Sequence, residues 1–223
     1  MNQIFKAARL EKSALTDSEL ALINQQTLRT FTADELFLFR LVACDNQPDR
    51  DHEVFSDSAL DGLAQLFPGR PVLLDHNWSA KSQTARVYAA SVESDGEIRR
   101  LVLRCYLPRM DATAETITRI ESGILREVSV GVSVQRVICS VCGADQLRGY
   151  CNHIPGHHYD GILCTMTLDG AADAYEVSLV PVPCQPGAGI VKSKRYGDAA
   201  TPHDPVPTPW QEKALLELEK NRY

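Results

Sequence analysis

The sequence predicts a β-rich α+β fold, built as a mostly antiparallel barrel or sandwich of about seven strands with two or more helices. Segments in which apolar and polar residues alternate recur along the chain, and clusters of turn-forming residues separate them. Two segments, within 56–67 and 111–123, carry their apolar residues at helical spacing instead. With 223 residues, of which 44% are hydrophobic, the chain can fill the core of one main domain.

The first strand is predicted over residues 35–44, ELFLFRLVAC, where aromatic and branched side chains are dense. Turn-forming residues at 45–48 end this strand. Ser56 is then placed to cap a helix with one apolar face, and Pro68 and Gly69 end that helix.

A short strand is predicted over residues 71–76, PVLLDH, and it places His76 at the end of a strand. Residues 84–93 and 99–107 then alternate on either side of a Ser-Asp-Gly turn, which predicts a hairpin. Two further alternating strands are expected near the end of the domain, at 164–168 and 174–182.

A helix, a turn and a strand are predicted after the hairpin. Ile117, Ile120 and Ile124 recur at helical spacing, Asp111 can cap the first turn, and Gly123 stands where a helix end favours a left-handed residue. The helix is therefore expected to end before the valine-rich strand that follows.

In the strand that begins at Val128, valines alternate with Ser129, Gly131, Ser133 and Gln135, so one face is apolar and Ser129 points away from the core. Gly131 is the neighbour of Ser129 on that face, and its missing side chain leaves space beside the hydroxyl. A serine on the outer face of a strand is a common structural feature, but this space suits a nucleophile.

Charge and composition argue against several classes of protein. A net charge of −6 provides no basic field for nucleic acid, and no apolar run reaches membrane-spanning length. The N-terminal stretch is too charged for a signal peptide, and seven cysteines, an odd number, suit a reducing compartment better than a disulfide framework. We expect a soluble protein that is not exported and has no organic cofactor.

Four metal-ligand residues lie close together in the chain: Cys139, Cys142, Cys151 and His153. A Cys-x2-Cys knuckle followed by a second pair predicts a closed, structural Zn²⁺ site within a cysteine-rich insert, residues 137–160. We expect this site to hold a loop beside the active site. The fourth ligand stays open, because three nearby residues could replace His153: His157, His158 and Cys164.

The main domain is predicted over residues 31–191, after an N-terminal arm, 1–30. Residues 192–208 have the composition of a Pro-rich linker, and 209–223 that of a short charged helix that serves docking or assembly.

Three segments occur in one order along the chain: LLDHNW (73–78) followed by SQTARV (82–87), GILREVSVGV (123–132) and AYEVSLVPVPCQPGAG (174–189). Together they resemble segments of the prohead (capsid maturation) proteases of tailed bacteriophages, distant relatives of the herpesvirus assemblins. The resemblance covers roughly residues 35–191 and implies an assemblin-like fold.

The resemblance implies a catalytic triad of His76 as base, Ser129 as nucleophile and Glu176 as the orienting acid. The herpesvirus enzymes use a second histidine in the third position, so His157 and His158 remain alternatives to Glu176.

The implied function is a serine endopeptidase of phage head maturation that cleaves scaffold and capsid-precursor chains, and itself, inside the immature shell in the host cytoplasm. The implied partners are the major capsid protein precursor, the scaffold and a second copy of the chain in a dimer. The alternative is a catalytically inactive capsid-assembly scaffold protein that keeps the structural zinc site.

Overall fold

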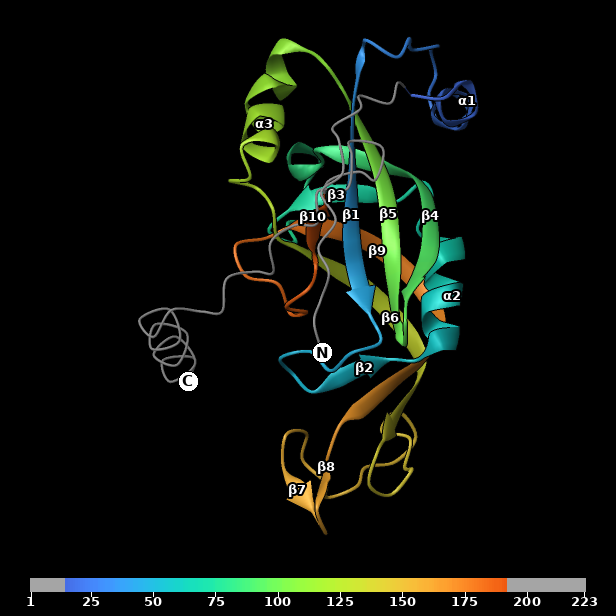
Figure 1. Cartoon of the computed structure of the whole chain (residues 1–223), viewed down its shortest axis with the longest axis vertical. Helices are drawn as coiled ribbons and strands as arrows, with labels where there is room; N and C mark the ends of the chain where they lie inside the picture. The colour runs from blue at the N-terminus through green and yellow to red at the C-terminus, as the bar shows by residue number, and fades with distance from the viewer. Residues whose placement is uncertain (1–14, 192–223) are drawn as a thin grey trace. The chain divides into compact units, whose positions relative to one another are not determined.

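The structure, a computed structural model that describes residues 15–191, forms a mixed α+β fold around one large sheet (Figure 1). Seven strands follow the order β10-β1-β5-β4-β3-β9-β2, and β6 pairs with β9 outside this path. Most pairs are antiparallel, but β2 and β3 run parallel to β9. The strands are β1 (Leu36–Asp45), β2 (Glu53–Phe55), β3 (Pro71–Leu74), β4 (Ala85–Asp95), β5 (Ile98–Pro108), β6 (Val128–Cys139), β9 (Met166–Leu179) and β10 (Gly189–Val191).

The described residues also contain a few short helices and a small hairpin at the far end of β6 and β9 (Figure 1). None of these helices has the length and apolar character needed to cross a membrane. Three predicted segments lie wholly or partly outside the described residues: residues 1–14 of the N-terminal arm, the linker at 192–208 and the terminal helix at 209–223. The elements are α1 (Asp17–Asn24), α2 (Asp57–Leu66), the 3₁₀ turn η1 (Ala80–Ser82), α3 (Asp111–Glu121), β7 (His158–Tyr159) and β8 (Ile162–Leu163).

Helix α2 and the β4–β5 hairpin form where the sequence predicts them. The Ser56 hydroxyl accepts a hydrogen bond from the Ala59 N–H at 3.1 Å and so caps α2. Gly62 lets α2 approach β9 closely, because a Cβ there would lie 2.8 Å from the Ala171 Cβ. The apolar face of α2 packs into the main core together with side chains from β1, β5, β6 and β9.

The prediction for α3 is confirmed except at its ends. Ile117 and Ile120 are buried, and Gly123 has a φ of +75° just after the last turn. Ile124 follows that turn and is therefore 66% exposed, outside the apolar stripe predicted for it. The N-cap position is Met110 rather than Asp111.

The mostly antiparallel α+β prediction is confirmed, but the sheet is not closed into a barrel. Within residues 15–191, β6 and β10 form no ladder, and the residues just before β6 bond to β10 through an isolated bridge between Glu127 and Gly189 and a hydrogen bond from the Ile190 N–H to the Arg126 carbonyl at 2.7 Å. Strand β10 has three residues, which is too short to extend this contact into a ladder.

The two strands predicted at 164–168 and 174–182 are one long strand, β9. The segment between them, which includes Gly170 at a φ of +66°, stays paired with β6 through two bulges instead of forming a turn. At one bulge Tyr175 has no partner on β6, so the alternation changes phase there. Ala174 therefore lies in the core with Val177, although strict alternation along 174–182 would place Ala174 on the face of Glu176.

Candidate functional site

His76 lies on a tight turn directly after β3. The predicted strand 71–76 ends at Leu74, and Asp75 and His76 have φ values of +54° and +51°. Left-handed backbone costs non-glycine residues about 1–2 kcal/mol each, so surrounding contacts must hold this turn. One such contact is a 3.0 Å hydrogen bond from the Asp75 N–H to the Leu179 carbonyl on β9. The turn leaves the His76 side chain 43% exposed.

The imidazole of His76 meets the carboxylate of Glu176. The His76 Nδ1 lies 2.8 Å from the Glu176 Oε1, although the two residues are 100 positions apart in the chain. Glu176 is 1% exposed, and the hydroxyl of Ser178, which is fully buried, donates a hydrogen bond to its Oε2. A carboxylate held in this way orients the imidazole so that its Nε2 is left for chemistry.

Gly131 makes room for this carboxylate. It pairs with Glu176 across β6 and β9, and a Cβ at position 131 would lie 2.5 Å from the Glu176 Oε1. A side chain at Gly131 therefore cannot coexist with the present position of the carboxylate. The sequence pattern indicated open space at Gly131, and Glu176 occupies that space.

Ser129 lies on the same face of the sheet, two residues before Gly131 on β6. It pairs directly with Ser178, which places the two Cβ atoms about 5 Å apart. The neighbouring pairs, Val128 with Leu179 and Val130 with Val177, point into the core. The Ser129 hydroxyl makes no side-chain hydrogen bond within residues 15–191. The structure thus brings Ser129, His76 and Glu176 to one region, with a bond between the last two.

Two exposed aromatic side chains flank this group, and sequence reasoning did not select them. Trp78, two residues after His76, is 69% exposed and meets Tyr175 edge to face with ring centroids 6.3 Å apart. The Tyr175 hydroxyl donates to the Ser133 hydroxyl at 3.1 Å. The pairing of β6 with β9 shows the bulge at Tyr175, which the alternation of apolar and polar residues in the sequence could not indicate.

The predicted metal ligands also come together. One ligand atom from each of Cys139, Cys142, Cys151 and His153 lies within 4.8 Å of all the others, and the Cys139 Sγ is 3.7 Å from the His153 Nδ1. Zn–S bonds of about 2.3 Å and Zn–N bonds of about 2.0 Å require donor separations close to these. The cluster could therefore hold a metal ion, and its donor set fits zinc.

The backbone of the knuckle favours an ionised thiol at Cys139. Burial opposes the charge, but hydrogen bonds from the backbone N–H groups of Cys142 and Val141, together with those from the Cys151 and Cys142 thiols, lower the pKa of Cys139 to about 7. The N–H of His153 likewise lowers the pKa of Cys151. Such thiolates are the form that binds a metal ion.

Cys164 lies next to Cys139 but does not belong to the group of four. Its Sγ lies 3.9 Å from the Cys139 Sγ, but it is fully buried, and burial raises the pKa of Cys164 to about 11. His157 and His158 do not belong to the group of four within the described chain, nor does either form a hydrogen bond with His76 there. His153 and Glu176 are therefore the better-placed candidates for the two open positions.

The cysteine insert is far from the His76–Glu176 pair, and the expectation that it lies beside the active site is wrong. The insert joins β9 at Met166, which precedes Glu176 by ten residues of strand, or about 30 Å. The alternation of the sequence did not show that β9 is continuous between them.

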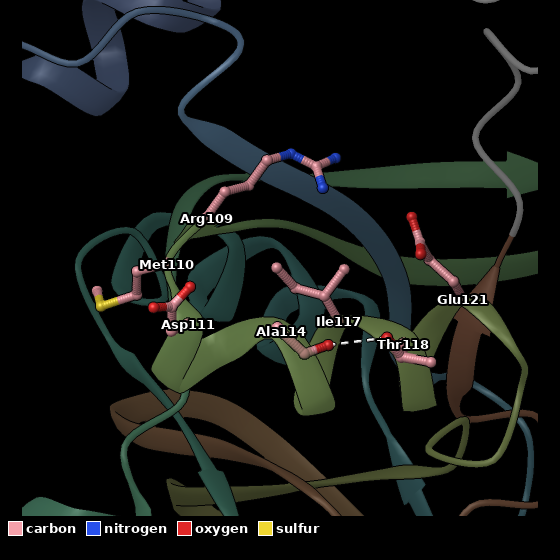
Figure 2. Close-up of a pocket in the computed structure, with 7 residues that line it drawn as sticks. All are labelled: Arg109, Met110, Asp111, Ala114, Ile117, Thr118 and Glu121. Carbon is pink, nitrogen blue, oxygen red and sulfur yellow. Dashed lines mark hydrogen bonds between the residues drawn. The ribbon is translucent and has the colours of Figure 1, made fainter.

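A shallow groove runs along α3 (Figure 2). It encloses about 430 Å³, and its lining includes Arg109, Met110 and Glu121 but none of the predicted catalytic or metal-binding residues. The Thr118 hydroxyl in this groove donates to the Ala114 carbonyl of its own helix at 2.9 Å. The groove therefore offers no convergent set of reactive groups.

The buried carboxylate, the imidazole and the nearby serine form the kind of arrangement that hydrolases use for nucleophilic catalysis. Comparisons with protein-family models, with curated proteins and with solved structures returned no match.

Proposed function

We propose that this chain is a serine endopeptidase in which Ser129 is the nucleophile, His76 the general base and Glu176 the orienting acid. The observation that carries the proposal is the 2.8 Å contact between His76 and the buried Glu176. The resemblance of the sequence to the prohead proteases implies the same two residues. Burying a carboxylate is unfavourable unless it is paired, and here its partners are an exposed imidazole and a hydroxyl.

In the proposed reaction, Ser129 Oγ attacks a peptide carbonyl carbon while His76 Nε2 takes the hydroxyl proton. Glu176 stabilises the imidazolium that results. The proton then passes to the leaving amine, and water releases the acyl group from Ser129 by the same route. Catalytic hydrogen bonds often become short only when substrate is bound, which accounts for the absence of a Ser129–His76 bond here.

The resemblance of the three segments leads us to propose phage head maturation as the setting. The substrates are then scaffold and capsid-precursor chains and the chain itself, inside the immature shell in the host cytoplasm, and the active form is a dimer. We also propose that the four-residue cluster holds a structural Zn²⁺, since four protein ligands leave no open position for catalysis.

Co-expression with the major capsid protein precursor, followed by mass spectrometry of the fragments, tests the peptidase proposal. Ser129→Ala is expected to abolish processing, because it removes the nucleophile. Ser133→Ala, on the same strand, is the matched control and should retain processing. If Ser129→Ala processes the precursor like the wild type, the peptidase proposal fails and the inactive scaffold protein becomes the better explanation.

A further inference from the structure

Ser178 is a buried polar residue to which the proposed mechanism gives no part. It is fully buried on β9, and its backbone lies between two other strands, paired with Leu73 of β3 on one side and Ser129 of β6 on the other. Strand β3 leads to His76, and β6 carries the proposed nucleophile. Ser178 therefore lies between the elements that must be aligned for catalysis.

The Ser178 hydroxyl completes a closed ring of hydrogen bonds. Its Oγ accepts from the His76 backbone N–H at 3.1 Å and donates to the Glu176 Oε2. The other carboxylate oxygen, Oε1, meets the Nδ1 of the His76 ring at 2.8 Å. Ser178 thus holds the backbone of His76, and Glu176 holds its ring. These two residues are two positions apart on β9.

We propose that Ser178 is a positioning residue that fixes the backbone and the imidazole of His76 relative to Ser129. The role in catalysis rests on the proposed peptidase function. The hydroxyl holds the His76 N–H in a turn whose left-handed backbone is unfavourable for histidine, and it also fixes the rotation of the Glu176 carboxylate. A displacement of about 1 Å in a catalytic group can reduce the rate about 100-fold, so this double restraint has a functional consequence.

The ring of bonds also selects one form of the imidazole. The Glu176 carboxylate can only accept a hydrogen bond, so the neutral His76 carries its hydrogen on Nδ1 and leaves Nε2 as the acceptor that a base needs. When Ser178 is removed, the carboxylate can rotate and the turn can relax. The neutral ring then divides between both forms.

The test compares Ser178→Ala with the wild type by two measurements on the full chain. Nitrogen-15 NMR of the His76 ring reports which nitrogen carries the hydrogen, and a fluorophosphonate probe reports the rate of Ser129 labelling. Ser178→Ala is expected to lose the Nδ1–H preference and to label about 10- to 100-fold more slowly. Ser178→Cys, which keeps the volume with a weaker hydrogen-bonding group, gives the same result if the alanine variant does not fold.

The matched control is Ser82→Ala, which removes another buried hydroxyl, one bonded to Ser79 at 2.8 Å. It should leave both measurements unchanged. The proposal for Ser178 is wrong if a folded Ser178 variant keeps the Nδ1–H form and labels within about twofold of the wild type. Failure of the peptidase function would instead appear as no labelling in the wild type, while the NMR comparison would still decide whether Ser178 positions His76.

Discussion

At the residue scale, Gly131 and Glu176 show how an absent side chain can define a site. Glu176 needs a buried place for its carboxylate beside His76, and the only atoms of Gly131 on that face are hydrogens. The sequence pattern indicated that Gly131 leaves open space beside the Ser129 hydroxyl, but it did not show that Glu176 fills this space. Which group fills such a space depends on strand register, and register is set by contacts far apart in the chain.

Gly131→Ala is expected to break the His76–Glu176 contact while the fold survives. The new Cβ would lie 2.5 Å from the Glu176 Oε1, so the carboxylate must move and lose its bonds. We expect a loss of about 1–3 kcal/mol in the free energy of unfolding and a labelling rate at Ser129 roughly 100-fold lower. Denaturant unfolding and fluorophosphonate labelling measure these effects.

The control for this substitution is Gly149→Ala, since a Cβ at Gly149 meets nothing within 4 Å. Its free energy of unfolding should change by less than about 0.5 kcal/mol and its labelling rate not at all. A Gly131→Ala protein that labels at the wild-type rate would contradict the role assigned to Glu176.

Glu176→Gln separates the charge of the acid from its shape. His76 and Ser178 bond to different oxygens of the carboxylate, so an amide, which replaces one oxygen with an NH₂ donor, loses one of these bonds, and it cannot stabilise an imidazolium by charge. We expect cleavage of the capsid precursor to slow by about 100-fold or more. Glu115→Gln, at a residue whose side chain is 85% exposed on α3, should cleave at the wild-type rate. Equal rates for the two variants would contradict an orienting role for Glu176.

At the scale of elements, local patterns predicted most of the fold. The alternation of 35–44, the cap at Ser56 and the glycine at 123 each depend on nearby residues, and β1, α2 and α3 formed at those places. The continuity of β9 could not be predicted, because its glycine and bulges are stabilised by pairing with β6. For the same reason, neither the exposure of Tyr175 nor the burial of Ala174 could be predicted.

The site was predicted as a set of residues but not as a geometry. Resemblance to the prohead proteases selected Glu176, and the structure supplied its contact with His76. Ser178 was not selected, because nothing in a local pattern distinguishes a buried hydroxyl that bonds a distant backbone N–H. The metal ligands could be predicted from local spacing, since two cysteines in a Cys-x2-Cys pair lie close together in the folded chain.

The affinity of the cysteine insert for zinc should depend on pH. Zinc must displace the proton from Cys139, and because the pKa of Cys139 is lowered to about 7, that proton returns as the pH falls below 7. Competition with a chromophoric chelator should therefore show affinity at least about tenfold lower at pH 6 than at pH 8.

Two substitutions make the pH experiment specific to the cluster. Cys139→Ser should remove tight zinc binding at both pH values, whereas Cys105→Ala, at a cysteine buried in the main core and outside any candidate metal group of the described residues, should leave the affinity unchanged. An affinity that is constant between pH 6 and pH 8 would show that Cys139 is not a ligand.

At the scale of the whole molecule, the apolar residues divide into separate clusters. The main core joins α2, α3 and the sheet, while Cys139, Cys164 and Met166 form a small cluster of their own under the insert. The ends of β6 and β9 connect the two, and β2 also reaches the small cluster, because Glu53 pairs with Met166 and the Met166 N–H donates to the His52 carbonyl at 2.9 Å. The His76–Glu176 pair lies at the opposite end of β9 from the insert, next to residues of the main core.

Removal of the proposed zinc ion should therefore loosen the insert and spare the proposed active site. Without the metal, the few apolar contacts of the small cluster cannot order the insert alone, since ligand binding supplies much of the folding energy of such knuckles. Hydrogen exchange should rise within 140–163 after treatment with a chelator, while Ser129 labelling and exchange in β1 and β5 stay near their original rates. Added zinc should restore the protection, which excludes irreversible damage. The insert is about 30 Å from Glu176 along β9, so a structural ion there can affect Ser129 only by unfolding the strands between them. An immediate loss of labelling with no increase in exchange would instead identify the metal as part of the catalytic chemistry.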